Sequence, residues 1–140
     1  MDGFWFKSDY FELEKGEEVE ANPFRYGNQL SRWLKTKLES IGYKGVEVIP
    51  EEMGWCVMFT NQPYRFLVNC GGKKHNEFNK TTKSAAKKEE IIWHCFIDAE
   101  IPFLKKIIKV VNTKQGKEQL YREIRNILSS EPGIEFVSAP

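Results

Sequence analysis

Two short segments with alternating side chains constrain the fold of this chain more than any other feature of its sequence. Residues 55–60 and 64–70 are rich in aromatic and β-branched side chains, and only residues 61–63 separate them. Two such segments with so short a connection are typical of neighbouring antiparallel strands. The sequence therefore predicts a β-hairpin over residues 55–70.

The position of the turn decides which side chains of the hairpin share a face. A turn at residues 61–64 places Trp55 opposite Cys70, on a core face that also carries Val57, Phe59, Phe66 and Val68. The other face is mixed rather than fully polar, with Cys56, Met58, Thr60, Arg65, Leu67 and Asn69. We expect a second layer or a partner to cover part of it. Because Cys56 and Cys70 fall on opposite faces, no disulfide is expected between them.

The spacing of apolar residues outside the hairpin predicts helices and further strands. Steps of three and four predict a helix over residues 26–41, capped by Gly42, and another over 114–129. A short helix is expected at 103–108. Apolar runs predict strands, one or two of them within 4–13 at a sheet edge, and others at 45–49, 91–97 and 134–137. The strand at 45–49 is expected to stop at Pro50. We expect an α+β fold: an antiparallel sheet of about four to six strands with two main helices packed on one face.

Length and composition favour one domain over residues 1–140. The chain has 140 residues, of which 41% are hydrophobic, and this is enough for one core. Its apolar runs are far shorter than the roughly 18 to 20 residues of a membrane span. Its three cysteines form no Cys-x-x-Cys pair, which favours a reducing compartment. We therefore expect a soluble cytoplasmic protein with no membrane segment, and a flexible loop in the lysine-rich stretch 72–90.

Two groups of residues are candidates for binding. The first is an acidic segment near the start of the chain, which would present a negative edge to a partner or pair internally; it includes Glu12, Glu14, Glu17 and Glu18. The second is a set of tryptophans, one on the main helix and two on main strands: Trp33, Trp55 and Trp93. These rings are expected either in a shared core or around a ligand pocket between helix and sheet.

Candidate catalytic residues are few. Cys70 precedes two glycines, and its thiol would act as a nucleophile if His94 on the next strand lay beside it. Buried free cysteine is commonly a structural residue, however, and the hairpin places Cys70 on the core face. The pair Glu51-Glu52 would divide acid and base roles in a pocket, although turn carboxylates are commonly just solvated. We therefore assign no catalytic residue. No histidine or cysteine spacing is typical of a metal site, so we also assign no metal ligand or cofactor.

The lysines of residues 73–88 are a candidate for contacts with a nucleic-acid backbone. Only Phe78 is interleaved among them as a stacking platform, and the net charge of the whole chain is +1. A solvated loop is therefore favoured over a nucleic-acid partner.

One set of apolar and turn residues forms a pattern along the chain: Tyr26-Gly27, Leu30, Trp33-Leu34, Leu38, Gly42-Tyr43, Glu51-Glu52-Met53-Gly54-Trp55 and Trp93-His94. In this pattern the chain resembles a group of small bacterial proteins with no assigned activity. The resemblance implies a shared fold and a bacterial origin, and it assigns no catalytic residue. The order of helix, antiparallel meander and helix is also similar to small secretion chaperones, which are typically acidic homodimers; the charge of +1 departs from that pattern.

These observations favour a noncatalytic bacterial protein-interaction domain. The expected partner is another protein or a second copy of the chain, bound through the acidic segment 12–20 and the mixed hairpin face with Arg65. One alternative is a small enzyme or ligand-binding protein with a pocket near Cys70, His94 and Glu51/Glu52. Another is a weak nucleic-acid binder that uses the lysines of residues 73–88.

Overall fold

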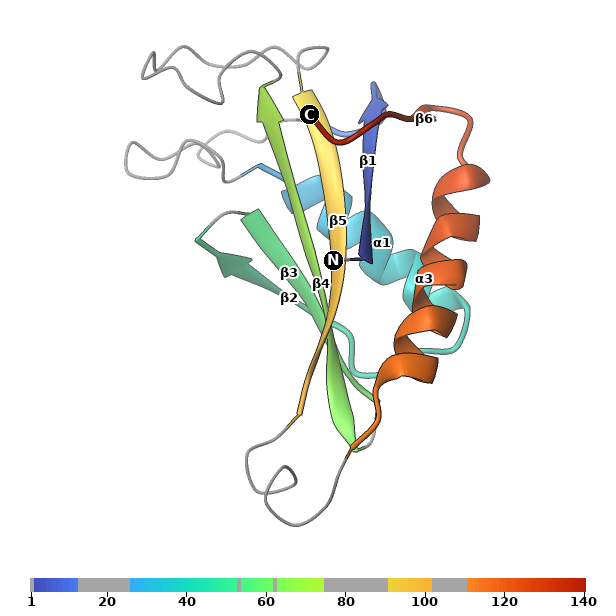
Figure 1. Ribbon diagram of the computed structural model, residues 1–140. Coiled ribbons are helices and arrows are strands. Elements are labelled where there is room, and N and C mark those ends of the chain that lie inside the picture. The colour runs from blue at the N-terminus through green and yellow to red at the C-terminus, as the bar shows by residue number, and fades with distance from the viewer. Residues whose placement is uncertain (1, 13–25, 53, 62, 75–90, 102–110) are drawn as a thin grey trace.

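The computed structural model describes residues 2–12, 26–52, 54–61, 63–74, 91–101 and 111–140 (Figure 1). Within these residues the elements follow in the order β1 (Asp2–Ser8), α1 (Asn28–Ser40), β2 (Glu47–Glu51), β3 (Gly54–Asn61), β4 (Tyr64–Lys74), β5 (Ile91–Glu100), α3 (Lys114–Ser129) and β6 (Ile134–Phe136). The six strands form one sheet, and every hydrogen-bonded neighbour is antiparallel. The predicted α+β fold is confirmed.

The strand order of the sheet is β2-β3-β4-β5-β1-β6. The first strand therefore lies inside the sheet, and its predicted edge position is wrong. It is enclosed because β5 pairs with it on one side while the short C-terminal strand β6 pairs with it on the other. The strand ends at Ser8; Tyr10 and Phe11 form a bend, although Phe11 is fully buried in the core.

The hairpin of β3 and β4 has the predicted register, with Trp55 opposite Cys70 and Phe59 opposite Phe66. β4 is longer than predicted, because Gly72 to Lys74 pair with the first residues of β5. The first residues of the predicted loop 72–90 are thus strand, and residues 75–90 lie outside the described residues. The predicted short helix at 103–108 also lies outside them.

The edge strand β2 runs through Pro50, where the sequence predicts that it stops. Pro50 is opposite Trp55, and the strand continues to Glu51. Proline lacks a backbone N–H, so it is tolerated on a strand whose other side has no neighbour. The outer position of β2 in the sheet is what allows this pairing.

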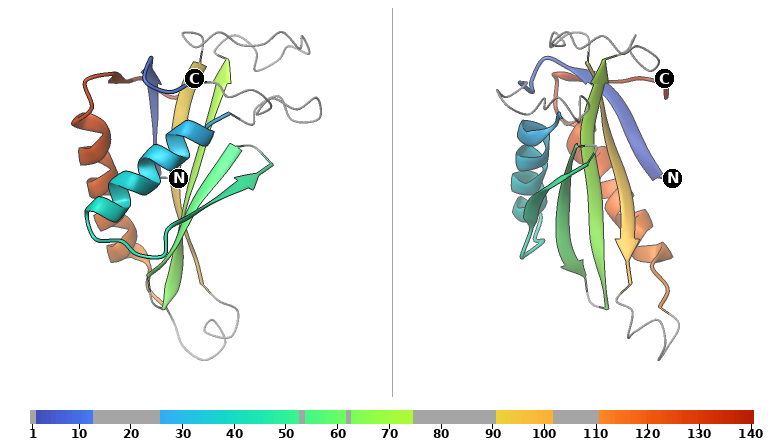
Figure 2. Two further views of the ribbon diagram at one scale, coloured as in Figure 1. Left: turned by 180° about the vertical axis from the view of Figure 1, so that it is seen from behind. Right: turned by 90° about the vertical axis from the view of Figure 1, so that its left-hand side faces the viewer.

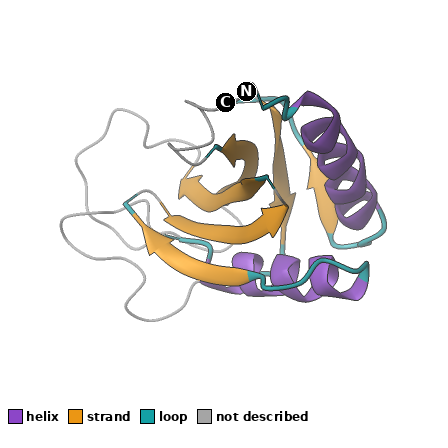
Figure 3. Ribbon diagram, turned by 90° about the horizontal axis from the view of Figure 1, so that it is seen from below, coloured by secondary structure: helices purple, strands orange, loops and turns teal. Residues whose placement is uncertain are grey.

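Both helices pack on one face of the sheet, with the end of α1 beside α3 (Figures 2 and 3). The apolar stripes predicted from the sequence are their buried faces: Leu30, Leu34 and Leu38 in α1, and Leu120, Ile124 and Leu128 in α3. These six side chains are fully buried, and each contributes about 1.5 to 3 kcal/mol by leaving water. They meet alternate residues of the strands in one hydrophobic core, which leaves the opposite face of the sheet, here called the open face, without a described helix.

Candidate functional site: an aromatic hollow on the open face

Three aromatic side chains of β1 and β5 gather on the open face. In β1 the side chains of Phe4 and Phe6 enter the core, so Trp5 between them points to the other side. In β5 the same alternation places His94 and Phe96 there. Trp5 lies directly opposite His94 in the sheet, and this register brings the three rings together.

The three rings contact one another closely. His94 and Phe96 are stacked, with ring centroids 4.6 Å apart and planes inclined by 16°. Trp5 and Phe96 make an edge-to-face contact with ring centroids 5.0 Å apart, and the centroid of the Trp5 ring lies 5.3 Å from that of His94. Gly3 is opposite Phe96, and a β-carbon there would collide with the Phe96 ring. A glycine at this position therefore leaves the space that the ring occupies.

These rings form one wall of a hollow of about 310 Å³. Its complete lining is Trp5, Glu51, Gly54, Trp55, Asn69, Cys70, Lys73, His94 and Phe96. The strand pairing also places Gly71 opposite His94, so no side chain stands beside the imidazole on β4. At Gly54 a β-carbon would meet the carbonyl oxygen of Cys70, and its φ of +151° is one that L-residues rarely adopt. Glycine thus permits the close approach of β3 and β4 at this hollow.

His94 is the buried polar group of the hollow. It is 7% exposed, and burial lowers its pKa to about 4, with a smaller contribution from the positive charge of Lys73. The imidazole is therefore neutral at neutral pH. Within the described part of the chain its Nδ1 has no hydrogen-bond partner. Leaving such an atom unpaired costs about 1 to 3 kcal/mol, which a bound polar group would recover.

Cys70 and His94 do not form the nucleophile and base that the sequence left as an alternative. Cys70 is opposite Cys95 in the core, with the two sulfur atoms 3.8 Å apart, whereas His94 lies on the open face. The contact with Cys95, together with burial, raises the pKa of the Cys70 thiol. Burial also raises the pKa of Cys56 to about 11. These thiols therefore stay protonated, and neither is an activated nucleophile.

The three predicted tryptophans lie in different environments. Trp93 is fully buried in the core. Trp33 is half-buried on α1, where its ring centroid lies 5.3 Å from that of Phe11. Trp55 has the predicted strand partner but is half-buried and lines the hollow. The three rings therefore form neither of the two predicted arrangements, a core shared by all three or a ligand pocket between helix and sheet.

Sequence reasoning missed Trp5, which completes the aromatic wall with His94 and Phe96. The signal was present in the alternation of residues 4–6, because a strand buried on one face must direct its middle ring to the other. The two residues of the predicted pair Glu51-Glu52 lie in different places. Glu51 lines the hollow, whereas Glu52 is exposed in the turn after β2.

The remaining predicted binding residues lie away from the hollow. Arg65 is on the open face and forms a cross-strand ion pair with Glu100. Glu12 is exposed, and its backbone N–H donates to Gln29 Oε1 at 2.8 Å. The described residues do not include Glu14, Glu17, Glu18 or residues 75–88 of the lysine-rich stretch. Binding through these residues therefore stays a prediction.

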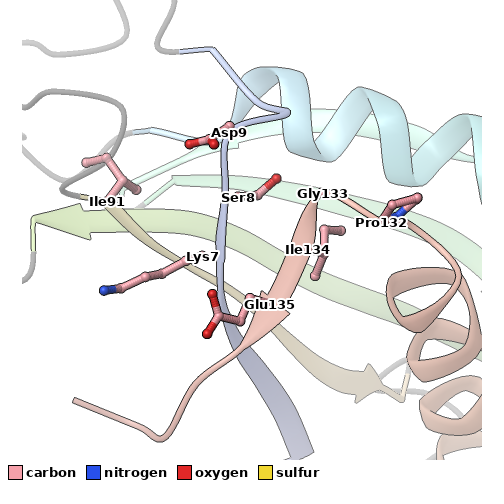
Figure 4. A pocket seen from close by; sticks show the side chains of 8 residues that line it. All are labelled: Lys7, Ser8, Asp9, Ile91, Pro132, Gly133, Ile134 and Glu135. Carbon is pink, nitrogen blue, oxygen red and sulfur yellow. The ribbon is translucent and has the colours of Figure 1, made fainter.

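A second hollow, of about 380 Å³, lies beside β1 and β6 (Figure 4). Its lining mixes polar and apolar residues and holds no aromatic ring: Lys7, Ser8, Asp9, Ile91, Pro132, Gly133, Ile134 and Glu135. Lys7 and Glu135 are paired across the two strands and extend to the same side. The aromatic hollow therefore offers much more apolar contact for a ligand.

The described residues hold neither a cluster of metal-binding side chains nor a membrane-spanning helix. Among them, no group of three or more His, Cys, Asp and Glu side chains is arranged to hold a metal ion. No helix among them is long and apolar enough to cross a membrane.

No protein-family model, curated protein or solved structure matches this chain. The resemblance to a small bacterial family therefore stays a prediction.

Proposed function

We propose that this protein is a noncatalytic binding module that holds a small ligand in the aromatic hollow of the open face. The observation that carries the proposal is the contact of Trp5 and Phe96 with the buried imidazole of His94 at the wall of one hollow. Binding sites for small molecules commonly combine an apolar, aromatic lining with a few polar groups that fix the orientation. This hollow has that composition.

The size of the hollow favours a small molecule. About 310 Å³ lies at the lower end of the roughly 300 to 1,000 Å³ that is common for ligand pockets. Flat rings are suited to it, because they would stack on Phe96 or Trp5 and exclude water from them. An N–H or carbonyl group on the ligand would then pair with His94 Nδ1.

Binding is favoured over catalysis by the state of the titratable groups. The thiol of Cys70 faces the core rather than the hollow, and its pKa is raised. His94 has a pKa of about 4, so it is a poor general base at neutral pH. A hollow that lacks an activated nucleophile or base is suited to holding a ligand unchanged.

A protein-interaction role remains a second proposal, favoured by the part of the open face beyond the hollow. There Met58 and Leu67 are paired and half-buried, and Arg65 and Glu100 lie one row further along the strands. This apolar pair beside charged residues has the character of a small contact surface. Chemical cross-linking of the purified protein, alone and with cell extract, tests it; cross-links that avoid this face would contradict it.

Matched tryptophan variants test the ligand proposal. Ligand-observed NMR with a library of flat aromatic fragments is applied to the wild type, Trp5→Leu and Trp33→Leu. Both replacements remove a half-buried indole, but only Trp5 lines the hollow. Fragments should bind the wild type and Trp33→Leu and lose binding to Trp5→Leu, while circular dichroism shows all three proteins folded. Binding that survives in Trp5→Leu, or a library without hits, would refute the proposal.

A further inference from the structure

Two cysteines of the core face each other across neighbouring strands of the sheet. Cys70 on β4 is the direct strand partner of Cys95 on β5, and their side chains are 1% and 0% exposed. Both are free thiols, with sulfur atoms 3.8 Å apart. The Cys70 thiol also lies 3.7 Å from the carbonyl oxygen of Val68, a weak contact because a thiol is a poor donor. The register of the sheet thus holds two thiols in direct contact.

We propose that Cys70 and Cys95 are a modification site, a dithiol that a small disulfide such as oxidised glutathione converts into a disulfide between β4 and β5. Directly opposite residues of antiparallel strands have Cα atoms roughly 4.5 to 5.5 Å apart, within the roughly 4.4 to 6.8 Å of disulfides. The sulfur atoms must approach from 3.8 Å to about 2.0 Å. Rotation of the two side chains supplies this approach without a change of register.

The reaction is a pair of thiol–disulfide exchanges, and it balances with oxidised glutathione as the oxidant. One protein thiolate attacks a sulfur atom of the oxidised glutathione, and the first glutathione thiolate leaves as a mixed disulfide forms. The facing protein thiolate then attacks the protein sulfur of the mixed disulfide, and the second glutathione thiolate leaves. The two protons of the protein thiols end on two molecules of glutathione. The protein therefore loses two electrons, and the glutathione gains them.

Burial governs the rate of this reaction, whereas the register governs its equilibrium. The contact with Cys95 and burial raise the pKa of the Cys70 thiol, so little thiolate is present in the closed sheet. The first exchange therefore proceeds when β4 and β5 open locally. As the strands pair again, their register brings the second thiol to the mixed disulfide. The folded state thus favours the disulfide, and by linkage the disulfide favours the folded state.

A glutathione redox titration of the full chain measures this preference. The wild type is equilibrated at neutral pH with mixtures of reduced and oxidised glutathione, in urea well below the unfolding midpoint and again in fully denaturing urea. Free thiols are then blocked with an alkylating reagent, and intact mass and peptide mapping count and locate the disulfides. The effective concentration of one thiol towards the other should be at least about tenfold higher in the folded protein than in the unfolded chain.

Cys56 is the matched control within the chain. It is 1% exposed, like Cys70, but its strand partner is Asn69 rather than a second thiol. Cys56→Ala should therefore keep the disulfide between Cys70 and Cys95, whereas folded Cys95→Ala should form no intramolecular disulfide. The oxidised wild type should also unfold at a higher urea concentration than its reduced form. Peptide mapping lets the wild type carry the test by itself if a variant fails to fold.

Three results would overturn the proposal. The first is an effective concentration in the folded protein no higher than in the unfolded chain, which would leave the two thiols as core packing. The second is a disulfide of the folded protein that includes Cys56. The third is a folded wild type that carries only glutathione adducts or resists oxidation altogether. Each of these results is independent of ligand binding in the hollow.

Discussion

The wild-type protein is expected to lose much stability in acid because of His94, and replacement of His94 by glutamine should remove this loss. The side chain is 7% exposed, and burial followed by the charge of Lys73 lowers its pKa from 6.5 to about 4. As the pH falls, the imidazole of the unfolded chain takes up a proton near pH 6.5, whereas that of the folded protein stays neutral until about pH 4. The unfolded state binds more protons in this window, so the free energy of unfolding decreases as the pH falls through it.

The size of the loss follows from these two pKa values. A difference of about 2.5 pKa units, at about 1.36 kcal/mol per unit, gives about 3 kcal/mol, lost almost completely by pH 4. At about pH 7.5 and above, the imidazole is largely neutral in both states, and His94 contributes little pH dependence. The charged groups that line the hollow with it are Glu51 and Lys73, and Lys7 lies on the adjacent row of β1. Because they are present in both proteins, their own titration largely cancels when the variant is compared with the wild type.

Urea unfolding followed by circular dichroism measures this effect. Between pH 7.5 and pH 4 the wild type should lose about 3 kcal/mol more stability than His94→Gln. An NMR titration of the imidazole of the folded wild type gives an independent value, expected near 4. Parallel pH dependences of the two proteins, with an imidazole that titrates near 6.5, would refute the burial of a neutral His94.

Three further predictions concern the backbone, the core and the thiols. Gly54→Ala should lower the free energy of unfolding by about 1 to 3 kcal/mol or more in thermal unfolding, because it adds backbone strain and a collision with the backbone of Cys70. Gly45 also has a positive φ but faces open space, so Gly45→Ala should cost less. Equal losses in the two variants would contradict this. Leu34→Ala should lower the free energy of unfolding by about 2 to 5 kcal/mol, measured in urea. Ile41 is 48% exposed, so Ile41→Ala should cost under about 1 kcal/mol. A loss in Leu34→Ala as small as that of Ile41→Ala would place Leu34 outside the core. Cys70 should react with a thiol reagent only as fast as the protein opens, and rapid labelling of the native protein would show it accessible.

The hairpin could be predicted from the sequence down to its register. Its turn is short, and the strict period of two fixes the partner of every residue once the turn is placed, as Trp55 and Cys70 show. The helical stripes were predictable for the same reason, since apolar residues at steps of three and four must share a face.

The rest of the sheet depends on contacts between distant segments, which local patterns do not encode. β1 lies inside the sheet because β6, at the other end of the chain, pairs with it. The length of β4 was missed because glycines and lysines are poor strand formers, and only pairing with β5 extends the strand to Lys74. Composition alone also did not show that Trp5 and Trp55 would both line one hollow while Trp93 entered the core.

The indole N–H signals of the four tryptophans test the central claim, ligand binding in the open-face hollow, most directly. Trp5 and Trp55 line the hollow, whereas Trp33 lies on α1 and Trp93 is buried in the core. ¹H–¹⁵N spectra are recorded while L-phenylalanine, phenethylamine and 3-phenylpropionate are added in separate titrations. Single Trp→Phe variants assign each indole signal. We expect saturable shifts of Trp5 and Trp55, with Trp33 and Trp93 unmoved, for at least one probe. Shifts confined to Trp33, or none with any probe, would contradict the account.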